Sequence, residues 1–169
     1  MIILSVIFLI ASFLIQGISS NYLSYLTGNI SFLSCLYVLI TLINLKQYYE
    51  SDKKYLLLLI IFGLLLDIVY SGTFILNATI FLIIYFFNKL FFTILPYNLI
   101  MTNVSSLFSI FIYHVITFLF LNILNYDNYS LSILFNTLIN NIIMTIIYTS
   151  INYLLIKFFK EKFELKEVR

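Results

Sequence analysis

The stretch from Tyr55 to Leu90 decides the fold, and its sequence is YLLLLIIFGLLLDIVYSGTFILNATIFLIIYFFNKL. As a single α-helix this apolar run of about 36 residues would be roughly 54 Å long at 1.5 Å per residue, whereas the hydrocarbon core of a bilayer is about 30 Å thick. The run must therefore break, and Ser71-Gly72-Thr73 is the natural hinge. We expect two short membrane spans, 55–71 and 73–90, joined by a tight turn. A re-entrant pair of helices is the alternative.

The composition of the whole chain agrees with a lipid environment. Its 169 residues are 63% hydrophobic and 9% charged, with a mean hydropathy of +1.09, whereas a soluble domain is about 25% charged. So few charged side chains could not cover this much apolar surface in water. The net charge of +2 is too small to indicate nucleic-acid binding, and the single Cys35 can form neither an intrachain disulfide nor a zinc site. We expect an all-α integral membrane protein in the lipid bilayer.

The rest of the chain has room for four more spans around the broken run. A turn at Gly28-Asn29, a charged loop from Lys46 to Lys54, the turn at Pro96 and the loop from Asn125 to Tyr129 separate them. The single transmembrane domain, 1–156, is thus a bundle of six helices with a charged and helical tail. The expected spans are about 1–16, 30–45, 55–71, 73–90, 99–124 and 131–156, and the tail is 157–169.

The basic residues indicate the topology, because cytoplasmic loops retain lysine and arginine during insertion. With six spans and the N-terminus inside, all basic residues lie inside and the outside loops hold one acid, Asp127. Five spans would divide the basic residues between the two sides. We therefore expect both termini in the cytoplasm. The inside residues are Lys46, Lys53, Lys54, Lys89, Lys157, Lys160, Lys162, Lys166 and Arg169.

Asp67 lies about one turn before the hinge, near the outer end of the third span. An ionisable residue inside a span suggests a functional site by default. We favour a structural role, in which Asp67 accepts hydrogen bonds from the hydroxyls and backbone amides of Ser71 to Thr73 and holds the helical hairpin together. Ligand binding is the alternative.

Polar residues also recur along the last two spans. His114 lies midway along the fifth span without a titratable neighbour, which favours a neutral histidine bonded to another helix over a proton relay or ligand contact. Side chains recurring every three or four residues predict helix packing, and a cavity for a polar ligand is the alternative. The fifth span carries Thr102, Ser105, Ser106, Ser109, Tyr113 and Thr117. The sixth carries Thr137, Asn141, Thr145 and Thr149, with Asn136, Asn140 and Asn152 beside them. The expected helix-interface residues are Ser106, Ser109, His114, Asn140, Asn141, Thr145 and Thr149.

The segment from Gly63 to Asp67 and the following Ser71-Gly72-Thr73-Phe, with Asn77 after it, resembles the rod shape-determining protein MreD of bacteria. Gly63, Asp67 and Gly72 match the family's pattern, and the likeness covers the whole chain in length and span number. Gln16 and Asn140 are also similar to residues that the family favours. The chain departs from the pattern in having Ile75 and Thr145 where a glycine and a proline are common, and in lacking a proline near the start of the second span. Residues of the motif and hinge are Gly63, Asp67, Ser71, Gly72, Thr73 and Asn77.

The resemblance implies a membrane scaffold of the cell-wall elongation machinery in the bacterial cell membrane, controlling cell shape. It would bind MreC and help couple MreB filaments to RodA and its transpeptidase partner in peptidoglycan synthesis. No catalytic motif occurs in the sequence, so we expect no enzyme activity, cofactor or metal. The family is thought to resemble the six-helix substrate-binding subunits of energy-coupling-factor vitamin transporters. The alternative function is therefore such a subunit, with an outward-facing pocket near Asp67 and His114.

Overall fold

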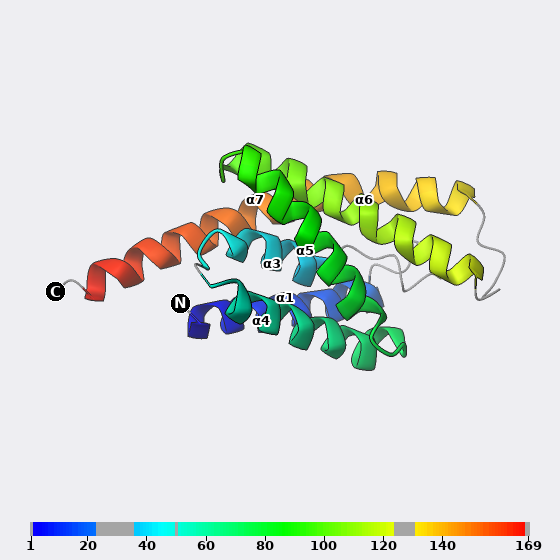
Figure 1. Ribbon diagram of the computed structural model, residues 1–169, viewed down its shortest axis with the longest axis horizontal. Helices are drawn as coiled ribbons and strands as arrows, with labels where there is room; N and C mark the ends of the chain where they lie inside the picture. Colours follow the sequence, from blue (N-terminus) through cyan, green and yellow to red (C-terminus); the bar gives the residue numbers. More distant parts are fainter. Residues whose placement is uncertain (1, 23–35, 50, 124–130, 168–169) are drawn as a thin grey trace.

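The protein is all-helical, as expected (Figure 1). The computed structural model describes residues 2–22, 36–49, 51–123 and 131–167, which form helices and the turns between them. The expected turn at Gly28-Asn29, the loop from Asn125 to Tyr129 and Cys35 lie outside these residues. The helices are α1 (Ile2–Tyr22), α3 (Tyr37–Lys46), α4 (Asp52–Leu66), the π-helix η2 (Asp67–Ser71), α5 (Leu76–Ile94), α6 (Leu99–Ile123) and α7 (Leu131–Glu167).

Five helical segments among the described residues are long and apolar enough to cross a bilayer. Both halves of the broken run belong to them, with 20 residues in Asp52–Ser71 and 19 in Leu76–Ile94, so their lengths favour two full spans over a re-entrant pair. α3 is apolar but has only 10 residues. The first part of the expected second span, residues 30–35, is not described.

Two helices continue beyond the ends of the expected spans. The first helix does not end at Gln16 but continues to Tyr22, and the Ser19 hydroxyl donates to the Gln16 carbonyl 3.0 Å away, which satisfies a polar side chain within the helix itself. The sixth span and the charged tail are one continuous helix, so the tail is helical to Glu167 as predicted and no break occurs near residue 156.

α3 forms the centre of the bundle. All its residues from Tyr37 to Leu45 are buried, and it packs against α1, α7, α6 and α4. The hairpins α4–α5 and α6–α7 are the two other main packing pairs. A helix that is apolar on every side is suited to such a central position.

The two ends of the bundle differ in charge. The start of α1, the connection from α3 to α4 and the turn from α5 to α6 lie at one end, and α7 projects beyond it (Figure 1). There Asp52 accepts from the ammonium groups of Lys46 at 2.7 Å and Lys89 at 2.8 Å. The connection from η2 to α5, which contains the hinge, lies at the opposite end (Figure 1). We call these the charged end and the hinge end.

Candidate functional site

Asp67 is the hydrogen-bond acceptor at the centre of the hinge end. Its side chain is buried, and its Oδ1 accepts from the hydroxyls of Ser71 at 3.3 Å and Thr73 at 2.7 Å. The predicted hydroxyl donors are therefore confirmed. The Ser71 and Thr73 oxygens are also 2.6 Å apart, which joins them in one network.

The amide donors differ from those predicted. They come from the first turn of α5 and not from Ser71 to Thr73: the Asn77 N–H donates to Oδ1 at 2.9 Å and the Ala78 N–H to Oδ2 at 3.3 Å. The Asn77 side-chain amide adds a bond to Oδ1 at 2.9 Å. The first amides of a helix lack intrahelical acceptors, and a negative charge is favourable there. Ile75, at the cap position of α5, offers no side-chain oxygen, so Asp67 caps α5 from the preceding helix.

The hinge itself is built from two left-handed residues. Gly72 has φ 60° and Ile75 has φ 68°. Glycine adopts this conformation without strain, whereas a β-branched residue does so at a cost of order 1–3 kcal/mol. The turn thus extends two residues beyond the predicted Ser71-Gly72-Thr73, and α5 begins at Leu76.

Gly63 lets the two helices of this hairpin approach closely. A Cβ at Gly63 would lie 2.6 Å from the Cα of Ala78, so only glycine fits against the α5 backbone. Gly63 and Asp67 are four residues apart and therefore share a face of the helix, which meets the first turn of α5. Asn77 then accepts from the Tyr113 hydroxyl at 2.5 Å, which ties α6 to the same point. The motif residues form a clamp between three helices.

The polar stripe of the fifth span is buried inside the chain. Asn88 of α5 bonds to two residues of this stripe. Its side chain donates to Ser109 at 2.8 Å and accepts from Ser105 at 2.6 Å. The stripe therefore packs helices of this chain together, and it is not exposed to a partner helix. Its buried residues are Thr102, Ser105, Ser106, Ser109, Tyr113 and Thr117.

The polar residues of the sixth span divide between two faces of α7. The inner stripe of Thr137, Asn141, Thr145, Thr149 and Asn152 is buried, as its spacing predicts. Asn140, which we expect at a helix interface, and Asn136 are exposed and lie outside this inner stripe. One residue turns an α-helix by about 100°, which is enough to move Asn140 away from the face of Asn141.

His114 is bonded to another helix, as expected. It is fully buried, and its Nε2 lies 3.4 Å from the Asn141 side-chain nitrogen across the α6–α7 interface. Its Nδ1 has no hydrogen-bond partner among the described residues. His114 and Asp67 are not bonded to each other. Tyr113, which precedes His114 in sequence, donates to Asn77, and Asn77 donates to Asp67.

A second polar network, which the sequence analysis did not single out, joins α1, α3 and α7. The Thr41 oxygen lies 2.6 Å from Ser12 and 3.2 Å from the Tyr148 hydroxyl, and it accepts from Asn152 at 3.0 Å. Asn44 donates to Asn152 at 3.2 Å. Thr41 and Asn44 are three residues apart in an apolar segment, which is the one sequence signal of their shared face.

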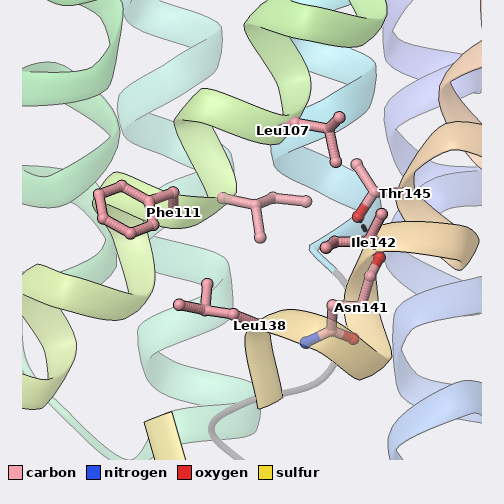
Figure 2. A pocket seen from close by; sticks show the side chains of 7 residues that line it. Leu107, Phe111, Leu138, Asn141, Ile142 and Thr145 are labelled. Atoms are coloured by element: carbon pink, nitrogen blue, oxygen red, sulfur yellow. Dashed lines mark hydrogen bonds between the residues drawn. The ribbon is translucent and has the colours of Figure 1, made fainter. Parts of the chain in front are cut away.

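A pocket of about 180 Å³ lies between α6 and α7 (Figure 2). Leu107 and Phe111 contribute from α6 and Leu138 and Ile142 from α7, while Asn141 and Thr145 supply its polar atoms. The Thr145 hydroxyl is already bonded to the Asn141 carbonyl at 2.6 Å. Phe111 and Ile142 are 50% and 43% exposed, so the pocket borders the outer surface of the hairpin.

The described residues contain no group of three or more histidine, cysteine, aspartate or glutamate side chains that could hold a metal ion. No family model, curated protein or solved structure matches this chain.

Proposed function

We propose that this protein is a non-enzymatic membrane scaffold of the MreD type, which binds MreC and links MreB filaments to RodA and its transpeptidase partner. The resemblance of the Gly63 to Asn77 segment suggests the family. The α6–α7 pocket is the observation that supports binding of a membrane partner.

The pocket suits the side chain of another membrane helix. Its walls are apolar, and it borders a surface formed by two helices that are long enough to span the bilayer. In hydrocarbon such a surface meets either lipid or another helix, and helices associate there through close packing and interhelical hydrogen bonds. A large apolar side chain of the MreC span would fill the pocket between Phe111 and Ile142.

The scaffold proposal does not use the polar stripes. The stripe of α6 and the inner stripe of α7 are buried by contacts within this chain, so the partner must bind an outer surface. On the proposed topology the cytoplasmic surfaces are the Lys46 to Lys54 connection and the projecting end of α7, where a filament or anionic lipid would bind.

The test is co-purification with the MreC of the same organism in mild detergent. Ile142→Trp and Leu107→Trp would occupy the pocket, and we expect each to reduce MreC recovery several-fold while the protein still inserts. Ile61→Trp is the control, because Ile61 is an exposed residue of α4, outside the α6–α7 hairpin. Unchanged MreC recovery with both pocket variants would refute docking at this pocket.

A second readout separates the scaffold from the transporter alternative. Depletion of a scaffold should round or widen a rod-shaped host, and no single nutrient should restore the shape. If the purified protein instead carries ATPase subunits and a bound metabolite, and one vitamin rescues depleted cells, the transporter function is correct and the scaffold proposal is wrong.

A further inference from the structure

The outer face of α7 carries a second regular stripe, on the side away from the inner stripe. We call it the outer seam. All of its residues are exposed, and their spacings of four, three and four residues repeat. Such an eleven-residue repeat stays on one face along almost the full length of a nearly straight helix. The outer seam consists of Asn136, Asn140, Ile143, Ile147, Ile151, Leu154 and Phe158.

The outer seam lies on the least buried of the five candidate spans. Only 22% of the residues in the Leu134–Lys162 span are buried, the smallest share among the five candidate spans. The apolar members of the seam are well exposed, with Ile143 at 66% and Leu154 at 56%. A lipid-facing helix needs apolar residues, so this part of the seam alone does not require a protein partner.

The two asparagines of the seam do indicate a partner. Asn140 lies inside the apolar Leu134–Lys162 span and Asn136 lies in its first turn, yet both side chains point away from the bundle. Neither makes a hydrogen bond within the described part of the chain. An amide in hydrocarbon is poorly solvated, and asparagine side chains commonly bond across helix interfaces in membranes.

The membrane restricts which helix can satisfy these amides. Two copies of one chain insert with the same topology, so a twofold axis relating them must run along the membrane normal. Their α7 helices are then parallel, and each seam residue faces its own counterpart at the same depth. An amide is both a donor and an acceptor, so Asn136 and Asn140 are complementary to themselves in that register.

We propose that a second copy of this chain packs along the outer seam, forming a parallel α7–α7 dimer in which Asn136 and Asn140 bond to their counterparts. The apolar part of the seam, from Ile143 to Phe158, forms the rest of the interface. The seam and the α6–α7 pocket lie on different faces of α7, so the dimer is independent of the proposed partner-binding function.

Disulfide crosslinking in native membranes tests this arrangement. In a Cys35→Ser background only introduced thiols react, and single substitutions Ile143→Cys, Ile147→Cys and Leu154→Cys place them on the seam. We expect each to form a disulfide-linked dimer several-fold more efficiently than Ile146→Cys, which is also exposed but lies about 100° around the helix from Ile147. Adding Asn136→Leu and Asn140→Leu together should lower the dimer yield.

The controls separate the dimer from other outcomes. Purified protein reconstituted at low density in phosphatidylethanolamine and phosphatidylglycerol vesicles should give the same pattern, since it requires no other protein. Ile142→Trp should leave the crosslinks unchanged, even if it abolishes MreC binding. Equal crosslinking at Ile146 and the seam, absence of dimers, or seam crosslinks to a protein of another mass would each overturn the proposal.

Discussion

At the hinge end, one carboxylate caps a helix that has no capping side chain of its own. Asp67 bonds to two amides of the first turn of α5 and to two hydroxyls of the hinge. Asp67→Leu would leave these buried donors unpaired at about 1–3 kcal/mol each, whereas Asp67→Asn keeps an acceptor at Oδ1. We expect the leucine variant to unfold at a clearly lower temperature in detergent, and the asparagine variant to be intermediate.

Membrane levels of the two Asp67 variants provide the control. The structural role requires that Asp67→Leu accumulates less than Asp67→Asn. If the leucine variant accumulates and unfolds normally, and Asp67→Asn alone abolishes cell-shape complementation, the negative charge itself has a function and the hinge role of Asp67 is wrong.

We expect Gly63→Ala to destabilise the protein, although glycine to alanine usually stabilises a helix. In an exposed helix, glycine to alanine stabilises by about 1 kcal/mol through helix propensity. Here the new Cβ would collide with the Ala78 backbone, so we expect Gly63→Ala to lower the unfolding temperature by separating α4 from α5. Ala78→Gly should not rescue it, because the collision is with Cα and not only with the methyl group. Stabilisation by Gly63→Ala would contradict this close approach.

The hinge shows what could be predicted at this scale. The hydroxyls of Ser71 and Thr73 follow Asp67 by four and six residues, so local spacing was enough to identify them as donors. The amides of Asn77 and Ala78 were missed because their position depends on where α5 begins. Ile75 adopts a left-handed conformation that its residue type disfavours, which extends the turn beyond the predicted boundary.

Among the elements, the central helix α3 depends on polar contacts as well as apolar packing. The Thr41 hydroxyl interacts with Ser12, Tyr148 and Asn152, three residues from two other helices. Thr41→Val keeps the shape but leaves buried polar partners unsatisfied, at about 1–3 kcal/mol. We expect a lower unfolding temperature, measured in the same detergent. Thr79→Val is the matched control, since the exposed Thr79 bonds only to its own helix at Ile75. Equal effects of the two variants would show that the network contributes little.

The spacing of polar residues predicted which face of a helix is buried, but not which helices cover that face. The every-fourth-residue spacing from Thr137 to Thr149 was sufficient to predict a buried stripe, and the structure places it inside the bundle. The same pattern could not show that α3, α5 and α6 bury the stripes, since a spacing carries no information about what covers a face. Asn140 is next to Asn141 in sequence but about 100° away from it on the helix, so it lies outside the buried stripe.

For the whole molecule, the positions of the charges follow from the order of the spans. Lys46 and Lys89 are distant in sequence, yet both bond to Asp52 at the charged end. The expected alternation of spans puts both residues in inside loops, at the same end of the bundle. Asp52 stabilises the connection between the helices there, while Lys53 and Lys54 remain exposed. The net positive charge of this end is what the insertion rule associates with the cytoplasm.

The topology can therefore be tested with one residue at each end. In a Cys35→Ser background, Phe74→Cys places a thiol at the hinge end, where Phe74 is 85% exposed, and Lys53→Cys places one at the charged end. A membrane-impermeant maleimide added to intact cells, or to spheroplasts if an outer membrane blocks access, should label residue 74 but not residue 53. Residue 53 should become reactive only after the membrane is opened.

Alkaline phosphatase fused after Arg169 should stay inactive, since the projecting end of α7 leaves the bundle at the charged end. Labelling of residue 53 from outside, or an active fusion, would require the opposite orientation and would place the basic residues on the side that the insertion rule disfavours.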